Sequence, residues 1–363
     1  MEKIKKIAVV SAFAIVLVGI MVIQMLLPDL ALSEFERRKL AQAPEITAEA
    51  IFSGDYFADL EEYLLDQFPA RQRFRALKAL FQYQILGMKD NNGLYQADGH
   101  LMKLDYPLNT SQASMAIGKF NAMIAAHPEM HQAYYSIIPD KNYFLAEANG
   151  YPTMDYAALL EAASSIQGQY IDIFPYLTVD DFYTTDSHWR QECIVPVAQA
   201  LASAMGTHAD GQDAYTPESR PGFYGVYAGQ SAVAAKPDSI TVMHSPVTDS
   251  AIVTSPEHPN ETLPVYNWDD FQGMDPYDTY LSGPEALLEI ENPLAENNRH
   301  LVLFRDSFGS SISPLLLSAY RHVTVVDLRY MTSAIVHQTV DFENADVLFL
   351  YSTGMFNAGA TIK

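Results

Sequence analysis

Residues 301–311 read Leu-Val-Leu-Phe-Arg-Asp-Ser-Phe-Gly-Ser-Ser. The four apolar residues at 301–304 predict a short buried strand, because they are too few for a helix and turn residues follow at once. Beyond Gly309, the apolar side chains of Leu315, Leu316 and Ala319 favour an amphipathic helix. Ser307 is therefore predicted to lie where a strand ends and a helix begins.

Two interpretations of Ser307 follow from this position. A serine at a strand–helix junction can expose its Oγ above a sheet, beside backbone N–H groups and the positive end of a helix. Such N–H groups can stabilise the negative charge that develops on an acyl carbonyl oxygen. The alternative is that Asp306 and Ser307 only cap the helix, because both residue types favour that position.

A second stretch, residues 183–189, reads Tyr-Thr-Thr-Asp-Ser-His-Trp. A serine nucleophile needs a base, and the base needs a carboxylate that fixes its tautomer. Asp186 and His188 can supply both from one short segment, although such a pair also occurs in ordinary polar loops. Together the two stretches predict a catalytic triad of Ser307, His188 and Asp186.

The same residues carry a family resemblance. Asp186-Ser187-His188-Trp189 and Arg305-Asp306-Ser307-Phe308 resemble the motifs of the DHHW family of bacterial exported proteins. More distantly, they resemble the SGNH-hydrolase-like domain of the alginate O-acetylation proteins. In both groups the Asp-x-His element precedes the serine element, as it does here. Ser187 departs from the pattern, since the family has a histidine there, and we interpret that position as non-catalytic.

The resemblance also implies residues beyond the triad. Pro139-Asp140-Lys141 is similar to a strand end of the family, which places Lys141 near the cleft, although a solvated loop lysine is an equal alternative. Arg305 in the serine motif and Tyr224 in a Phe-Tyr-Gly element are further substrate-binding candidates. Asn357 follows the last predicted strand and is a candidate oxyanion donor; the alternative is an exposed loop residue.

The wider pattern predicts an α/β fold. Apolar and β-branched runs at 134–138, 322–327 and 345–351 are typical of a parallel sheet buried on both faces. With helices between them, they predict an SGNH-hydrolase-like sheet flanked by helices. Residues 206–298 are less regular and predict a β-rich insertion that caps the cleft or binds polymer. Trp268 within it could stack on a sugar ring or belong to a local core.

Composition excludes several classes of function. The chain has 363 residues, of which 49% are hydrophobic, and a net charge of −22, which argues against nucleic-acid binding. The single cysteine, Cys193, rules out an internal disulfide. The histidines do not fall into ligand-spaced clusters, and no glycine-rich phosphate loop occurs, so no metal or cofactor is predicted.

The N-terminus predicts an extracytoplasmic protein. Lys3, Lys5 and Lys6 precede an uncharged run at 7–27, which is long enough to span a bilayer with the N-terminus inside. Residues 1–33 are predicted to form a cytoplasmic stub and an anchor, and residues 34–363 one extracytoplasmic domain. A cleaved signal peptide ending near Ser33 is the alternative. Helical spacing at 55–86, interrupted by Pro69, predicts apolar side chains packed in a core.

Three functions remain open on these grounds. The first is transfer of an acyl group, such as acetyl, to a cell-surface polysaccharide, with a membrane-bound acyltransferase as partner. The second is an esterase or deacetylase with the same triad. The third is a polysaccharide-binding scaffold protein without catalysis, which the departure at Ser187 keeps open.

Overall fold

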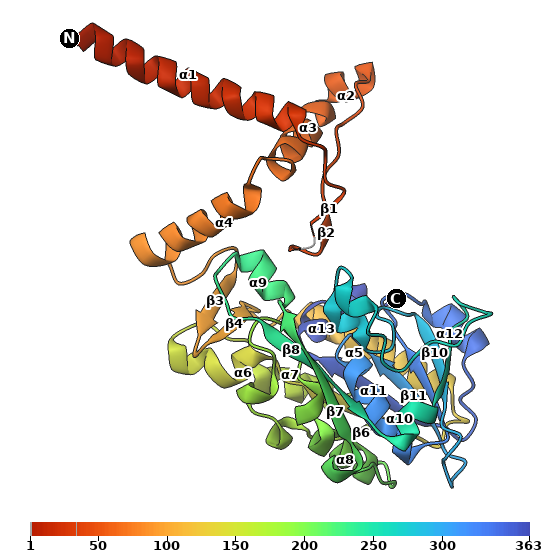
Figure 1. Ribbon diagram of the computed structural model, residues 1–363. Helices are drawn as coiled ribbons and strands as arrows, with labels where there is room; N and C mark the ends of the chain where they lie inside the picture. The colour runs from red at the N-terminus through yellow and green to blue at the C-terminus, as the bar shows by residue number, and fades with distance from the viewer. Residues whose placement is uncertain (1, 34) are drawn as a thin grey trace. The chain divides into compact units, whose positions relative to one another are not determined.

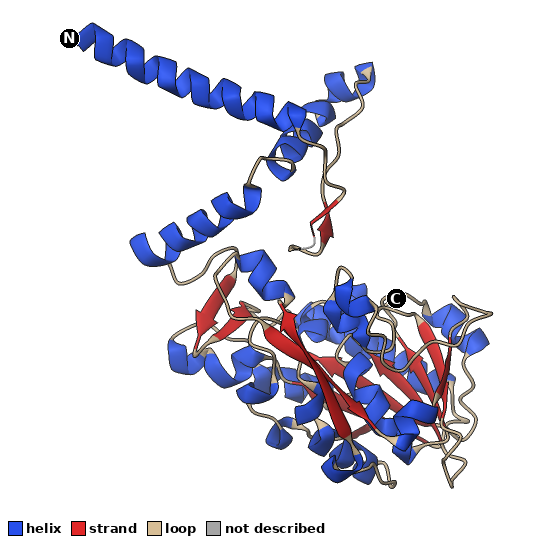
Figure 2. Ribbon diagram, in the orientation of Figure 1, coloured by secondary structure: helices blue, strands red, loops and turns tan. Residues whose placement is uncertain are grey.

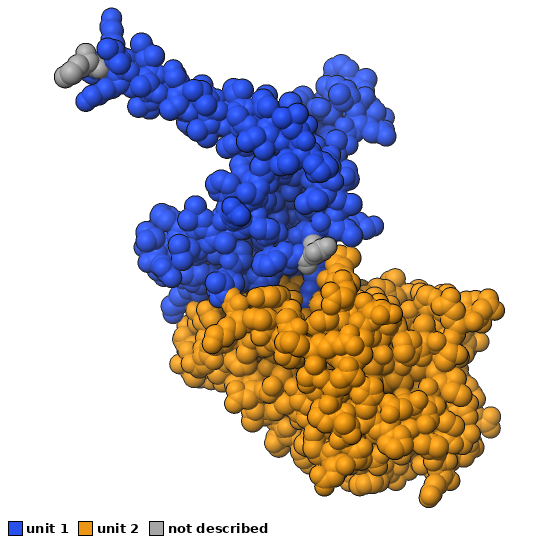
Figure 3. All heavy atoms as spheres, viewed as in Figure 1, with its two compact units in different colours: residues 1–92, 228–234 blue, residues 93–227, 235–363 orange. Residues whose placement is uncertain are grey.

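The computed structural model describes residues 2–33 and 35–363. It divides into two compact units (Figure 3). Unit 1 comprises residues 1–92 and 228–234, and unit 2 comprises residues 93–227 and 235–363. The boundary predicted at Glu34 falls on a residue outside this description.

A seven-stranded, mostly parallel sheet forms the centre of unit 2 (Figures 1 and 2). In spatial order its strands are β6 (Gln169–Tyr170), β5 (Gln132–Ile138), β13 (Asp346–Ser352), β11 (His300–Arg305), β12 (His322–Val326), β10 (Leu287–Glu291) and β9 (Ile252–Thr254). Only β10 runs against the others, since it pairs antiparallel with both β12 and β9. The predicted α/β fold with a parallel sheet is confirmed.

Side chains of the central strands alternate between two hydrophobic cores, as a strand period of two residues requires. On β11, Leu301 and Leu303 enter one core, whereas Val302 and Phe304 enter the other. Helices therefore cover both faces of the sheet. The first core is closed by α8 (Val195–Ala204) and α11 (Gly309–Leu316). The second is closed by α5 (Thr110–Ala126), α7 (Tyr156–Ala163), α12 (Ser333–Thr339) and α13 (Thr353–Asn357).

The predicted insertion at 206–298 is only partly separate from the sheet. Its strands β9 and β10 extend the central sheet at one edge, because their apolar residues Val253, Leu288 and Ile290 belong to the first core. The remainder contains α10 (Pro246–Ser250) and an antiparallel ribbon of β7 (Thr216–Phe223) and β8 (Asp238–His244).

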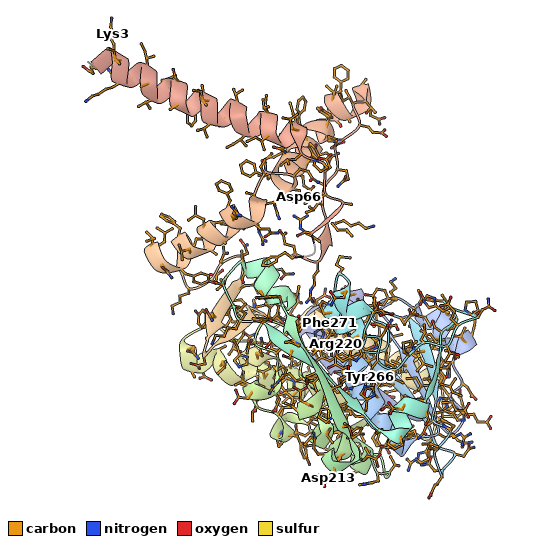
Figure 4. The ribbon with its side chains drawn as sticks, in the orientation of Figure 1. Lys3, Asp66, Asp213, Arg220, Tyr266 and Phe271 are labelled. Carbon is orange, nitrogen blue, oxygen red and sulfur yellow. The ribbon has the colours of Figure 1, made fainter. Side chains whose placement is uncertain are left out.

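Aromatic residues of this insertion form a small core of their own. Tyr277, Tyr280 and Phe223 are buried there, and Trp268 and Tyr266 pack against them. The guanidinium of Arg220 lies 4.2 Å from the centre of the Trp268 ring. Figure 4 labels Arg220, Tyr266 and Phe271 in this region. Trp268 therefore belongs to a local core and is not an exposed platform for a sugar ring.

A hairpin and a short helix complete the part of unit 2 that bears on the site. Strands β3 (Leu94–Ala97) and β4 (His100–Lys103) pair across Asp98 and Gly99, both with positive φ. This is the turn chemistry that Asp-Gly predicts. Helix α6 (Lys141–Leu145) begins directly after β5, capped by the Asp140 side chain.

Unit 1 consists mainly of helices. They are α1 (Glu2–Leu26), α2 (Ala48–Ser53), α3 (Asp55–Asp66), α4 (Arg71–Leu80) and a π-helical turn, η1 (Phe81–Ile85), with a minimal pair of strands, β1 (Leu32–Ser33) and β2 (Arg38–Lys39). Helix α9 (Val226–Ser231) begins in unit 2 and continues into unit 1. Among the described residues, α1 is the one helix long and apolar enough to cross a membrane.

The break predicted at Pro69 is confirmed, since α3 ends at Asp66 and α4 begins at Arg71. Asp66, labelled in Figure 4, accepts hydrogen bonds from Arg38 Nη1 at 2.7 Å and from the Ala41 N–H at 2.9 Å. The predicted core packing of this region is wrong. Phe57 and Phe74 stay more than half exposed, although Phe57 shares a shallow hollow with Leu17 and Met21 of α1.

Candidate active site

The site lies at the carboxyl ends of neighbouring parallel strands, where α/β sheets bind their ligands. Asp306 follows β11 directly and connects it to β13. Its Oδ1 accepts a hydrogen bond from the Phe308 N–H at 3.0 Å, and its Oδ2 accepts one from the Ser352 N–H at 2.9 Å. Asp306 thus shapes the turn that presents Ser307, so the capping and nucleophile interpretations are compatible.

Ser307, His188 and Asp186 form a continuous hydrogen-bonded chain. His188 Nε2 lies 2.7 Å from Ser307 Oγ, and His188 Nδ1 lies 2.6 Å from Asp186 Oδ1. Asp186 is fully buried and His188 nearly so. This is the order of contacts that a serine nucleophile, a base and its orienting carboxylate require.

The Asp186 carboxylate is held from several directions. Its Oδ1 also accepts from the His188 N–H at 3.1 Å, and its Oδ2 accepts from the Val226 N–H at 2.8 Å. The preceding loop is held by Asp238 at the start of β8, which accepts hydrogen bonds from the N–H and hydroxyl groups of both Thr184 and Thr185. Because each acceptor oxygen is occupied, the carboxylate has one well-defined orientation.

Aromatic rings position the imidazole and the serine turn. The Tyr277 ring stacks on His188 at 3.9 Å between ring centres. Trp189 Nε1 donates to the Phe308 carbonyl at 3.1 Å and to Ser311 Oγ at 2.9 Å. The tryptophan of the Asp-Ser-His-Trp motif therefore ties the histidine loop to the start of α11.

A polar cavity of about 340 Å³ opens beside Ser307. Its lining includes Asp105, Asp140, Lys141, Tyr227, Arg329 and Ser187. Such a mixture of carboxylates, cations and hydroxyls can donate to and accept from the hydroxyl groups of a sugar. The Ser307 N–H has no acceptor among residues 2–33 and 35–363, so it is available to an oxyanion.

Lys141 lies in this cavity and is buried. Its Nζ donates to the Tyr183 carbonyl at 2.9 Å, and it lies 5.4 Å from the centre of the Tyr227 ring. Burial lowers the Lys141 pKa to about 7, although Asp186, Asp238 and Asp140 act in the opposite direction. Lys141 is therefore a group beside Ser307 whose charge changes near neutral pH.

This pKa predicts a pH-dependent stability. Because the folded-state pKa lies below its ordinary value of 10.5, the unfolded chain binds more protons between about pH 7 and 10.5. The free-energy cost of burying the Lys141 charge is therefore largest below pH 7, and it decreases as the pH rises and the buried amine loses its proton. Relative to Lys141→Met, the wild-type free energy of unfolding should rise by about 2 to 3 kcal/mol from pH 6 to pH 9. Urea unfolding of both proteins at the two pH values measures this, and an unchanged difference would contradict it.

Other charges in the cavity are also shifted or paired. Burial raises the pKa of Asp140, whose carboxylate accepts from Tyr156 and Asn142, and burial raises the pKa of Asp105 as well. Arg329 lines the cavity while its Nη2 pairs with Asp327 Oδ2 at 2.6 Å.

Three candidates named from the sequence have other surroundings. Asn357 lines the cavity, but its Nδ2 donates to Asp105 Oδ1 at 2.7 Å and to the Pro107 carbonyl at 3.2 Å. Both amide hydrogens are therefore engaged, and the oxyanion role predicted for Asn357 is not supported. Arg305 is buried outside the cavity lining, 3.2 Å from Asp327 Oδ2. Tyr224 is 46% exposed and is not among the lining residues.

Gly225, beside Tyr224, has a clearer structural role. A Cβ built there would lie 2.4 Å from both Asp186 Cβ and the Thr185 carbonyl oxygen. The Gly225 N–H also donates to Thr185 Oγ1 at 2.8 Å. Only glycine allows this approach of the two backbones.

Gly225→Ala should therefore displace Asp186. We expect kcat/KM for an ester to fall about 100-fold, since a shift of about 1 Å in a catalytic group has that effect, and stability to fall by about 1 to 3 kcal/mol. Gly118→Ala is the matched control, because Gly118 is an exposed glycine within α5 with no atom near its Cβ position. It should gain up to about 1 kcal/mol of stability and keep its activity. Full activity of Gly225→Ala would contradict the proposed role of Asp186.

Solved structures of other proteins share this fold. A DHHW family protein from Eubacterium siraeum matches 75% of this chain and 95% of its own, with a TM-score of 0.63 and 18% identity. The fold is similar to that of a DHHW family protein. Bacillus cereus PatB1, solved with a sulfonyl adduct, matches 72% of this chain and 97% of its own, with a TM-score of 0.58 and 18% identity.

A weaker match is the O-acetyltransferase domain of Pseudomonas putida AlgJ, with a TM-score of 0.42 and 13% identity over 73% of this chain and 92% of that domain. The sequence matches no family model, and no curated protein matches it at a significant level. The predicted DHHW relation is thus supported at the level of fold.

Several residues of this site were not singled out from the sequence. Tyr277 and Asp238 are distant in the chain from the motifs they support, so no local pattern could indicate them. Gly225 and Trp189 lay within quoted motifs, but the backbone approach and the indole hydrogen bonds that explain them are tertiary. No cluster of three or more metal-ligating side chains occurs among the described residues.

Proposed function

We propose that this protein is an extracytoplasmic, serine-dependent enzyme that transfers an acetyl group to hydroxyls of a cell-surface polysaccharide. The observation that carries the proposal is the hydrogen-bonded chain from Asp186 through His188 to Ser307 beside a polar cavity. Both parts are needed, because the hydrogen-bonded chain requires a cavity that holds the substrate, and the cavity requires a nucleophile.

In the first half-reaction, Ser307 Oγ attacks the carbonyl carbon of an acetyl ester. His188 Nε2 takes the serine proton, while Asp186 keeps Nδ1 protonated and stabilises the imidazolium. The Ser307 N–H stabilises the oxyanion of the tetrahedral intermediate. His188 then returns the proton to the departing donor alcohol, which leaves acetyl-Ser307.

In the second half-reaction, a sugar hydroxyl occupies the cavity and gives its proton to His188. Its oxygen attacks the acetyl carbonyl carbon, and the bond to Ser307 Oγ breaks as His188 reprotonates that oxygen. Asp105, Asp140 and Arg329 are the cavity groups suited to orienting a sugar. If water replaced the sugar, the same steps would amount to ester hydrolysis.

The N-terminal helix supports the cellular placement within this proposal. Helix α1 is long and apolar enough to cross a bilayer, and lysines precede its apolar run. We infer that α1 anchors the chain with units 1 and 2 outside the cytoplasm. A membrane-bound acyltransferase that delivers acetyl groups fits such an arrangement as a partner.

The experiment that tests the function follows the fate of the acetyl group. The purified full-length protein is given an aryl acetate together with a neutral oligosaccharide, and the released phenol and the acetylated sugar are quantified separately. A sulfonyl fluoride-treated sample is the blank. Acetylated oligosaccharide above the blank supports transfer, and phenol release without acetylated oligosaccharide supports hydrolysis. The absence of both products would overturn the catalytic proposal.

A further inference from the structure

A second surface of the chain, in unit 1, is formed by a basic stretch of the sequence. Residues 67–89 contain five basic side chains and no acidic one, although the whole chain has 44 acidic residues and 22 basic ones. This stretch includes α4 and η1. Arg71 and Arg75 lie against the Glu36 carboxylate, so the positive charge that α4 presents to a negatively charged partner is that of Arg73 and Lys78.

The same helix carries an exposed apolar stripe. Phe74, Leu77, Phe81 and Ile85 recur at spacings of three and four residues, so they share one side of a helix. Their exposures are 54%, 59%, 50% and 68%. This is an unusually large exposed apolar surface for so short a segment.

The opposite side of α4 is attached to the rest of unit 1. Arg71 pairs with Glu36, and Arg75 donates to the Gly229 carbonyl at 3.0 Å and to the Gln230 carbonyl at 2.9 Å. Arg73 and Lys78 lie on the two flanks of the stripe and are exposed. The helix therefore has one side anchored to the protein and another that is apolar with basic edges.

We propose that α4 and η1 lie in the headgroup region of an anionic lipid bilayer, with the stripe of Phe74, Leu77, Phe81 and Ile85 at the acyl boundary. An apolar face with basic flanks is the pattern of an interfacial helix. Basic side chains near an anionic surface strengthen its binding to such a helix. This inference does not depend on the proposed acyl transfer.

A bilayer accounts for more of the observations than a protein partner does. Helix α1 belongs to the same unit, and near its C-terminal end Gln24 Nε2 donates to the Leu64 carbonyl of α3 at 3.2 Å. Helix α3 leads into α4 within a few residues. If α1 crosses a bilayer, the start of unit 1 lies at the outer lipid surface, where the stripe and its basic flanks have a partner at hand.

The test measures lipid contact at single positions of the full-length protein. Cys193, the only cysteine, is replaced in Cys193→Ala, and an environment-sensitive fluorophore is attached through Leu77→Cys. Ala76→Cys is the matched control, because Ala76 is also exposed but lies about 100° further round the helix. The proteins are placed in vesicles of equal parts phosphatidylglycerol and phosphatidylcholine, with or without brominated acyl chains.

We expect brominated lipid to remove most of the emission of the fluorophore at position 77 and little of that at position 76. Adding Arg73→Glu with Lys78→Glu should reduce quenching at 77 towards the level in phosphatidylcholine alone, while α1 keeps the protein in the vesicle. Equal quenching at both positions, or none at 77, would overturn the proposal. A blue shift that grows with protein concentration and is insensitive to brominated lipid would instead indicate contact with a second copy of the chain.

Discussion

Ser307→Ala is expected to lower kcat for an aryl acetate by about six orders of magnitude and to abolish labelling by a sulfonyl fluoride. The reason is chemical, because alanine lacks Oγ, the atom that lies 2.7 Å from His188 Nε2 and that would form the acyl bond. Initial rates of phenol release and the mass of the labelled protein measure the two effects. The fold should be unaffected, since alanine fits wherever serine does.

Ser310→Ala serves as the matched control for this substitution. Ser310 is a buried serine of α11, three residues beyond Ser307, and it does not line the cavity. Its activity and labelling should remain within a few-fold of wild type. If Ser307→Ala retained activity or labelling, the nucleophile would be another residue, and the proposed reaction would have no support from this site.

Asp186→Asn is expected to produce the second-largest loss, about three to four orders of magnitude in kcat. The amide has nearly the shape of the carboxylate, so the Val226 N–H can still find an acceptor oxygen. The neutral amide cannot stabilise the imidazolium, and it favours the wrong tautomer of His188 when its NH2 group faces Nδ1. The rate of Ser307 labelling by a sulfonyl fluoride should fall with the rate of ester turnover.

The double variant Ser307→Ala with Asp186→Asn sharpens this prediction. Residues that act as one catalytic unit are not additive, so the second substitution should cost almost nothing once Ser307 is absent. Circular dichroism and urea unfolding of each variant check that the fold persists. Two additive losses would mean that Asp186 acts independently of Ser307, which would contradict the proposal that Asp186, His188 and Ser307 act as one catalytic unit.

The central sheet was predictable because its information is local. Each strand combines a short apolar run with a polar turn immediately after it, and burial on both faces favours β-branched and large apolar side chains throughout. The closeness of Asp186, His188 and Ser307 was predictable for a related reason. Asp186 and His188 are neighbours in the chain, and the serine sits at a strand end, where side chains from several strands meet.

Other features were beyond local pattern. Asn357 had the right residue type and position for an oxyanion donor, yet its amide hydrogens are engaged by Asp105 and Pro107, more than 200 residues away in the chain. The helices predicted by the spacing at 55–86 are present, but such spacing indicates only that one face is apolar and not what that face contacts. The exposed stripe of α4 shows how an amphipathic face can be left for a partner outside the chain.

Local sequence was enough to predict the α/β class, the strand–serine–helix junction, the Asp186–His188 pair and the apolar N-terminal helix, because each depends on residues close together in the chain. Long-range packing was needed to show that His188 reaches Ser307, that Tyr277 and Asp238 support the histidine loop, and that Lys141 is buried in the cavity. These contacts join residues separated by tens to more than a hundred positions. They form only when the sheet and its loops are packed together, and no local propensity encodes them.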